Sequence, residues 1–190
     1  MANKGYTSRG RVENYMLITI DPSFYDQVEE WIGEVESYID DFTGRNFKAD
    51  AEASDRVYDG DRSPDLIIDD AVAVTTNGVT IDGDAAGEYL LYPANALPKT
   101  RVHLKSGKFP RGDQNVTVNA KWGYSESVPA NIVWAATVLL AGIIDYAWNG
   151  SGEVQSETIG RYSVTYRTPD GQKDYERAQD ILNSYIKQVA

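Results

Sequence analysis

Residues 129–148 read PANIVWAATVLLAGIIDYAW, a stretch that would be apolar on nearly every side of a helix. Pro129 stands where the first helical residue is expected, a position at which its missing N–H costs nothing. A helix that is apolar all round must be covered by other elements, so the stretch predicts the central helix of a bundle. It is no longer than the run of ~20 apolar residues that a bilayer requires. Because it also contains Asn131, Thr137 and Asp145, we do not expect it to span a membrane.

Two amphipathic helices are expected to cover this central helix. Asp21 and Pro22 make a good start for the first, and apolar residues then recur at steps of three and four until Gly44. The same spacing at 175–189 predicts the second. A third, shorter helix is expected at 11–16. With helical segments on both sides of the middle of the chain, we expect the two ends to pack together.

The middle of the chain changes to a periodicity of two, which is typical of β-strands. Seven short strands are expected there, at 55–58, 65–69, 71–76, 79–82, 88–92, 100–105 and 115–122. Asn77 and Gly78 lie between two alternating runs and predict a two-residue hairpin turn. The expected fold class is therefore α+β, a helical bundle domain with an inserted small antiparallel β domain, either a sandwich or a barrel. The helical domain would comprise 1–53 and 124–190, and the β domain 54–123.

Composition excludes several classes of protein. The formal net charge is -11, which argues against wrapping nucleic acid, because phosphate binding needs clustered Lys and Arg. The sequence has no cysteine, so disulfides, thiol catalysis and thiolate metal sites are excluded together. The N-terminal stretch lacks the apolar core of a signal peptide, so we expect a protein that is not secreted.

Few residues suggest catalysis or metal binding. His103 is the only histidine, and it shares a strand face with Arg101 and Lys105, which predicts a solvated cationic surface. The acidic run from Asp59 to Asp70 could gather oxygen ligands for calcium, but it lacks the glycine of the EF-hand loop, so a turn is the simpler interpretation. We therefore expect no enzyme activity and no cofactor.

Two charged stretches remain as candidate surfaces. The first long helix carries acids with no Lys or Arg between 21 and 44, which is either an ordinary solvated face or a functional anionic wall; the residues are Glu29, Glu30, Glu34, Glu36, Asp40 and Asp41. The second stretch, 99–111, contains cations and no acid, and predicts a basic docking patch of Lys99, Arg101, Lys105, Lys108 and Arg111.

The order of three motifs resembles a known family. Thr43-Gly44-Arg45 follows the first long helix, WGYSESVPA at 122–130 leads into the central helix, and an arm with the pattern S-x-x-x-G-x-Y-S-V-x-Y occupies 156–166. In this order the chain is similar to the head-to-tail connector proteins of tailed phages, also called adaptor or head-completion proteins. The resemblance covers the helical ends well and the β insertion less specifically.

The resemblance implies a structural virion protein of the phage neck, made in the host bacterial cytoplasm. Such a protein forms a ring, usually of twelve copies, that docks under the portal protein and extends the DNA channel. It also provides the surface to which the tail or a stopper protein attaches, and it has no catalytic activity. Packaged DNA passes through such a ring without specific binding.

The same resemblance assigns two sets of contact residues. The terminal helix would dock on the portal through Tyr175, Ala178, Ile181, Leu182, Tyr185 and Ile186. The arm at 157–167 would contact a neighbouring subunit or the channel lumen through Arg161, Tyr162, Ser163, Val164 and Tyr166.

These expectations give the charged stretches roles. An acidic lumen would repel phosphates, so we expect the anionic helix face to line the channel. The basic patch would touch capsid, decoration or tail proteins. An alternative is a glycan- or host-surface-binding module with an oligomerising helical base, in which aromatic residues stack on sugars; these would be Tyr89, Tyr92, Trp122 and Tyr124.

Overall fold

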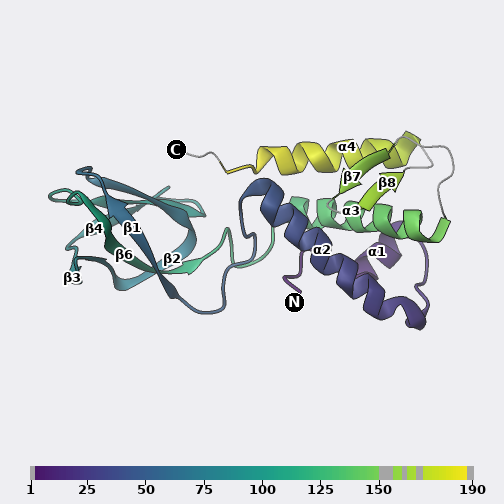
Figure 1. Ribbon diagram of the computed structural model, residues 1–190, viewed down its shortest axis with the longest axis horizontal. Coiled ribbons are helices and arrows are strands. Elements are labelled where there is room, and N and C mark those ends of the chain that lie inside the picture. Colours follow the sequence, from purple (N-terminus) through teal and green to yellow (C-terminus); the bar gives the residue numbers. More distant parts are fainter. Residues whose placement is uncertain (1–2, 150–155, 160–161, 166–168, 188–190) are drawn as a thin grey trace. The chain divides into compact units, whose positions relative to one another are not determined.

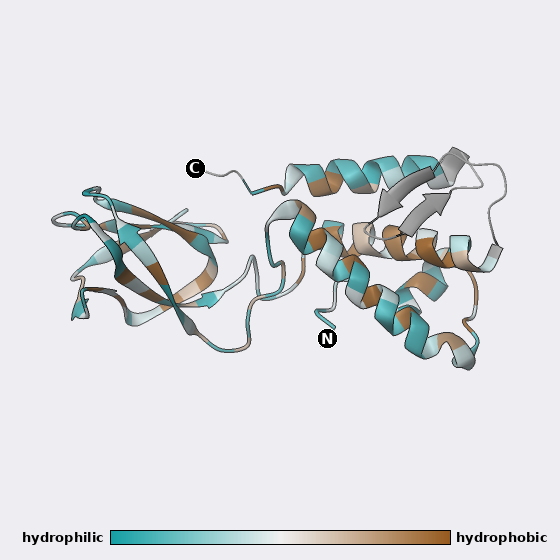
Figure 2. Ribbon diagram, viewed as in Figure 1, coloured by the Kyte–Doolittle hydropathy of each residue, from teal (hydrophilic) through white to brown (hydrophobic). Residues whose placement is uncertain are grey.

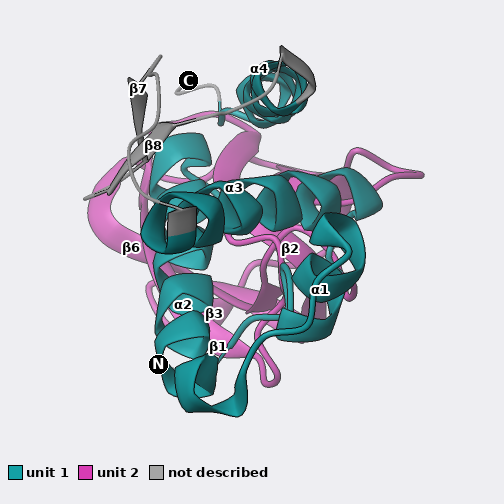
Figure 3. Ribbon diagram, turned by 90° about the vertical axis from the view of Figure 1, so that its right-hand side faces the viewer, with its two compact units in different colours: residues 1–45, 128–190 teal, residues 46–127 magenta. Residues whose placement is uncertain are grey.

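The computed structural model divides into two compact units, which are coloured separately in Figure 3. Unit 1 comprises residues 1–45 and 128–190, and unit 2 comprises residues 46–127. The structure describes residues 3–149, 156–159, 162–165 and 169–187. Each unit is built around its own core and is described separately below.

Helices dominate unit 1. In order along the chain they are α1 (Arg9–Met16), the short 3-10 helix η1 (Pro22–Phe24), α2 (Tyr25–Thr43), α3 (Ala130–Asn149) and α4 (Pro169–Ser184). Between α3 and α4 a two-stranded antiparallel hairpin is formed by β7 (Ser156–Ile159) and β8 (Tyr162–Thr165). Helix α3 lies in the middle of the unit, with α4 on one side and α1 and α2 on the other (Figures 1 and 3).

Helix α3 forms the core of unit 1, as the sequence predicts. It begins one residue after Pro129, whose carbonyl accepts the Val133 N–H at 3.0 Å. From Ala135 to Ile144 every side chain is buried, and the helix is brown along most of its length in Figure 2. Among the described residues it is the one helix long and apolar enough to cross a membrane, but 61% of that window is buried inside the protein. Packing against the other helices therefore accounts for its composition.

The ends of α1 and α2 follow from local capping. Ser8 caps α1 by accepting the Arg11 N–H, and Asp21 caps η1 by accepting the Ser23 N–H at 2.8 Å. Helix α2 ends at Gly44, which adopts the left-handed conformation (φ 65°) that glycine tolerates best. The predicted end of this helix is confirmed, whereas Asp21 and Pro22 begin η1 and α2 itself starts at Tyr25.

Unit 2 is one antiparallel sheet of six strands in the order β1-β6-β2-β5-β4, with β3 paired to β2. The strands are β1 (Ser54–Gly60), β2 (Asp65–Ile81), β3 (Asp84–Ala85), β4 (Tyr89–Tyr92), β5 (Lys99–Leu104) and β6 (Gly112–Trp122). The first half of β2 pairs with β5 and the second half with β6. The sheet curls around a single apolar cluster that includes Leu66, Val102, Phe109, Val118 and Trp122.

The predicted hairpin turn at Asn77-Gly78 is wrong. Residues 65–81 form one strand of 17 residues, and the turn comes later, at Asp82-Gly83, where both residues have positive φ. Between Val74 and Val79 the register against β6 shifts, so the Asn-Gly pair makes a bulge. Gly78 is required there because a Cβ would lie 2.6 Å from the Asn119 carbonyl oxygen.

The predicted fold class is also wrong. The structure is a mixed α+β protein in which the six-stranded sheet is the largest assembly, rather than a helical bundle with a small sandwich or barrel attached. The reason is the long β2 strand, which joins three expected short strands and links β5 to β6 in one sheet. In unit 1, α1 is only eight residues long and a hairpin separates α3 from α4.

The units divide at residues 45/46 and 127/128, and not at the expected 53/54 and 123/124. Phe47 and Ala49 belong to unit 2, and both are buried. The Ala49 N–H donates to the Ser125 carbonyl at 3.0 Å, and the Tyr124 N–H donates to the Asn46 carbonyl at 2.8 Å. These bonds hold the two ends of unit 2 side by side.

Candidate interaction surface

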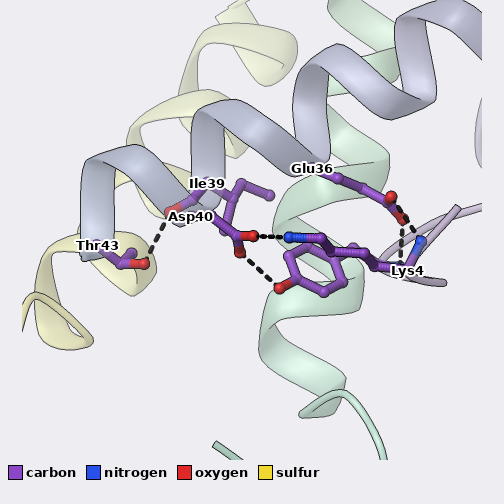
Figure 4. Close-up of polar contacts among 6 residues, drawn as sticks. Lys4, Glu36, Ile39, Asp40 and Thr43 are labelled. Carbon is purple, nitrogen blue, oxygen red and sulfur yellow. Dashed lines mark hydrogen bonds and ion pairs between the residues drawn. The ribbon is translucent and has the colours of Figure 1, made fainter. Parts of the chain in front are cut away.

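The acidic face of α2 is divided between buried and exposed carboxylates. Glu36 is only 2% exposed, and its carboxylate accepts two backbone N–H groups, from Lys4 at 2.7 Å and from Tyr6 at 2.9 Å (Figure 4). A buried carboxylate costs free energy unless hydrogen bonds compensate it, and here two amide donors do so. Glu36 therefore anchors the N-terminal segment to α2.

Asp40 extends the same anchor one turn along the helix. Its carboxylate accepts the Tyr6 hydroxyl at 2.5 Å and forms an ion pair with the Lys4 ammonium (Figure 4). Tyr6 is fully buried. Beside it, the Thr7 hydroxyl is hydrogen-bonded to the Thr137 hydroxyl of α3, with the two oxygens 2.8 Å apart. Residues 4–7 thus tie α2 to the central helix.

The predicted anionic face is therefore smaller than expected. Glu36 and Asp40 have structural partners within unit 1, and Glu34 is partly buried. The exposed acids of α2 are Asp26, Glu29, Glu30 and Asp41, which we call the acidic stripe. Helical spacing places Asp26, Glu30 and Asp41 on one side of α2, because steps of four and eleven residues return to nearly the same direction.

Most of the predicted portal-docking side chains on α4 are packed inside unit 1. Tyr175, Ala178 and Leu182 are 2% exposed or less, since the apolar side of α4 faces α3. The helix ends at Ser184, so Tyr185 and Ile186 lie beyond it. After the helix, the Lys187 N–H donates to the Thr43 carbonyl at 2.8 Å, which ties the end of this segment to α2.

Of this predicted docking set, Ile186 is exposed at 40%, and Ile181 and Tyr185 are partly exposed. The Tyr185 carbonyl accepts the Arg45 Nε–H at 2.6 Å, so the backbone of Tyr185 is hydrogen-bonded within unit 1. At its other end α4 is tied to α1, because the Tyr15 hydroxyl donates to Asp174 Oδ2 at 2.6 Å. Burial and this carboxylate raise the pKa of Tyr15.

The predicted arm forms the β7–β8 hairpin. Tyr162, Ser163 and Val164 lie in β8 and pair with Ile159, Thr158 and Glu157 of β7. Arg161 and Tyr166 of the same prediction lie outside the described residues. Within the described part of the chain, this hairpin is a sheet of its own and does not extend the sheet of unit 2.

The basic stretch 99–111 is partly neutralised by neighbouring groups. Lys105 forms an ion pair with Glu88 at 3.0 Å, and Arg101 lies 3.5 Å from Asp65. The Lys99 ammonium donates to two backbone carbonyls. Lys108 and Arg111 are exposed, so they are the freest cations of the predicted patch.

His103 does not lie on a purely cationic face. It is directly opposite Asp65 in the β2–β5 register, and its Nδ1 lies 2.9 Å from Asp65 Oδ1. The Tyr92 ring packs edge-on against the imidazole of His103. The Arg101 guanidinium lies over the same Tyr92 ring, 4.5 Å from the ring centre. The sequence could not reveal this cluster because the register that brings Asp65 to His103 is a long-range property.

The remaining sequence candidates have ordinary structural roles. Trp122 is buried at 1% exposure, so its ring is not available for a sugar to stack on, and Tyr124, which is partly exposed, packs on Phe47. In the acidic run, Asp61 accepts the Ser63 N–H, as a turn residue does, and Asp59 of β1 accepts the Gln114 N–H of β6. The described residues contain no group of three carboxylates or imidazoles arranged to hold a metal ion.

Sequence reasoning missed a set of exposed apolar side chains. In unit 1 these include Leu17 (90% exposed), Phe24 and Trp148, and in unit 2 they include Ile67 and Leu90. Ile67 and Leu90 could have been noticed as apolar residues on the polar side of alternating strands. For Leu17 the sequence carried no signal, because its exposure depends on the left-handed turn that ends α1.

Comparisons with known proteins identify no family. A scan against protein-family models and a search of curated proteins each found no match to the chain. Function must therefore be inferred from the residues and their arrangement.

Proposed function

We propose that this protein is a ring-forming adaptor of a tailed-phage neck, which docks under the portal, extends the DNA channel and offers a surface for tail attachment. The order of the TGR, WGY and arm motifs supports this proposal. The single structural observation that carries it is the acidic stripe of α2, which is exposed on a helix anchored at Glu36 and Asp40.

The acidic stripe has the chemistry that a DNA channel requires. Duplex DNA carries one negative charge per ~1.7 Å of its axis, so cations on the wall would hold it by releasing counterions. Carboxylates repel the phosphates and leave the duplex free to move. Helix α2 contains no Lys or Arg between 25 and 43, so nothing on this helix opposes that repulsion.

In this proposal, unit 2 supplies the outward contacts of the ring. Lys108 and Arg111 are exposed on the loop between β5 and β6, where they are available to an acidic capsid or tail protein. The portal contact uses the exposed Ile186 and the partly exposed Ile181 and Tyr185, since Tyr175, Ala178 and Leu182 are buried. Neither role involves catalysis.

Reversing charge on the acidic stripe tests the role of α2. The variant Glu29→Lys/Glu30→Lys should retard duplex DNA passing through assembled portal–adaptor rings, and the delay should shrink as salt is raised. The matched control is Glu52→Lys/Asp84→Lys, which changes net charge equally at exposed positions of unit 2. Equal passage of DNA through both variant rings would contradict the channel role of α2.

A further inference from the structure

Leu17 is an unusual residue at the end of α1. It is 90% exposed and adopts a left-handed conformation (φ 56°, ψ 43°), with its N–H donating to the Glu13 carbonyl. Glycine is the residue favoured at such a position, because a Cβ is strained there. A leucine thus combines an unfavourable backbone conformation with an exposed apolar side chain.

Two further apolar side chains are exposed at the same end of unit 1. Phe24 and Trp148 are 40% and 36% exposed, and their ring centres lie 5.7 Å apart. The segment after α1, the start of α2 and the end of α3 all lie at the end of unit 1 that faces the viewer in Figure 3. We call Leu17, Phe24 and Trp148 the helical end.

The helical end lies beside acidic residues. Asp21 and Asp26 flank Phe24 in the sequence and are both exposed. Asp21 accepts hydrogen bonds from the Ser23 hydroxyl and N–H, and these bonds lower the pKa of its carboxyl, so it remains charged near neutral pH. A partner surface for this end must therefore offer apolar side chains together with cations.

Unit 2 carries a surface with that chemistry. On the outer side of β2, β5 and β4, strand register places two rows of residues next to each other, Asp65-His103-Leu90 and Ile67-Arg101-Tyr92. We call these six residues the outer sheet face. Ile67 and Leu90 are 56% and 41% exposed, and the Arg101 side chain is 40% exposed. Lys105 and Lys108 follow directly along the chain and are exposed as well.

We propose that the helical end of one copy docks on the outer sheet face of a second copy. The apolar side chains of the two surfaces would be buried against each other, and Asp21 would face Lys108 together with Arg101 and Lys105, which also pair with Asp65 and Glu88. This inference rests on the proposed ring function and names the contact between neighbouring subunits. In a chain with a net charge of -11, the cations of 99–111 offset Asp65 and Glu88 beside them, which lowers the repulsion of another acidic copy at this surface.

The symmetry of such a contact fits a ring. The two surfaces are different and lie on different units, so the contact is heterologous and each copy keeps one of each surface for its other neighbour. Repetition of one heterologous contact produces a closed ring when the rotation permits closure. An isologous dimer would instead require one surface to match itself.

The variant Leu17→Gly separates this role from a structural one. Because glycine relieves the left-handed strain, the variant monomer should melt at the same temperature as wild type or higher. Its self-association, followed by sedimentation velocity over a concentration series, should weaken by about tenfold or more, as for the loss of a central interface leucine. The matched control, Val57→Thr, alters an exposed aliphatic residue on β1 and should leave self-association unchanged.

Several outcomes would overturn the inference. They are unchanged self-association of Leu17→Gly, equal weakening by Val57→Thr, or a wild-type chain that remains monomeric at every concentration. A photo-crosslinker at position 17 gives a second readout, since it should label residues 89–104 of another copy. If rings form under the portal but position 17 labels the portal, or no residue in 89–104, the subunit contact fails while the adaptor function stands.

Discussion

Glu36 shows how one residue can decide whether a charged surface is available. From its place in the sequence it belongs to the acidic side of α2, yet it is buried and accepts the N–H groups of Lys4 and Tyr6. Removing it would leave buried donors without a partner, at a cost of about 1–3 kcal/mol for each.

The variant Glu36→Ala should therefore lower the free energy of unfolding by roughly 2 kcal/mol or more in a urea titration. Glu30→Ala is the matched control, because Glu30 lies on the same helix but is exposed. That control should change the free energy of unfolding by about 0.5 kcal/mol or less. Equal effects of the two variants would mean that Glu36 does not anchor the N-terminal segment.

Tyr58 provides a pH-dependent test within unit 2. Its hydroxyl donates to Asp69 Oδ2 at 3.2 Å, and burial, followed by the Asp69 charge, raises the pKa of Tyr58 to about 12 from the ordinary 10.0. The unfolded chain loses this proton at lower pH than the folded protein does, so the unfolded state binds fewer protons between those two values. The free energy of unfolding should therefore fall as pH rises from about 10 to about 12.

The variant Tyr58→Phe should make that fall shallower, because phenylalanine has no proton to lose. The measurement is the free energy of unfolding of both proteins at a series of pH values above 9. Tyr89 serves as a comparison, since burial raises its pKa too and Tyr89→Phe should act in the same direction. An identical pH dependence in Tyr58→Phe and wild type would contradict the assignment.

At the scale of elements, the bulge in β2 is the feature that shapes the sheet. Gly78 allows the Asn119 carbonyl to approach, and the Thr75 hydroxyl donates to the Asn119 side-chain oxygen at 2.8 Å. Gly78→Ala should destabilise the protein by roughly 1–3 kcal/mol, because its Cβ would meet backbone oxygen atoms that cannot yield. Thermal unfolding monitored by circular dichroism measures this effect.

Gly33→Ala is the matched control for that substitution. Gly33 lies inside α2 with open space around its position, so alanine should stabilise the helix by roughly 0.5–1 kcal/mol. The two Gly→Ala variants should therefore shift the melting temperature in opposite directions. A neutral Gly78→Ala would show that the bulge is not as tightly packed as described.

The elements that the sequence predicts well are those fixed by local signals. Helix α3 follows from its apolar run, and α2 follows from its apolar spacing and from Gly44 at its end, with Asp21 capping η1 just before it. The fold class could not be predicted, because Asn77-Gly78 and Asp82-Gly83 are both good turn signals. Only pairing with β6 decides that the first makes a bulge and the second a turn.

The candidate surfaces show the same limit. Helical periodicity identifies the acidic side of α2, but it cannot show that the N-terminal segment covers Glu36 and Asp40. Likewise, it identifies the apolar side of α4 but not that α3 already occupies it. Packing between residues far apart in the sequence decides which side chains remain available to a partner. The periodicity of a single helix does not contain that information.

At the scale of the whole molecule, unit 2 should fold by itself. It is a continuous segment with its own core, and backbone bonds join Asn46 to Tyr124 and Ala49 to Ser125 at its two ends. A protein of residues 46–127 should unfold cooperatively and give dispersed amide resonances in an NMR spectrum. Amide resonances with poor dispersion would show that the core of unit 2 does not fold without unit 1.

The distribution of charge is also a property of the whole molecule. The chain is strongly acidic, its exposed acids include the stripe on α2, and the cations of 99–111 are gathered on unit 2. In the proposed adaptor, the acids of α2 would repel DNA and the cations of unit 2 would attract proteins.

The most direct test of this account is electron microscopy of the purified protein, alone and mixed with the portal protein encoded near its gene. We expect rings that cap the portal around a central channel, with Asp26, Glu30 and Asp41 facing that channel. A protein that remains monomeric in both samples would contradict the adaptor function. A portal-capping ring with these acids on its outer surface would contradict the channel role of α2.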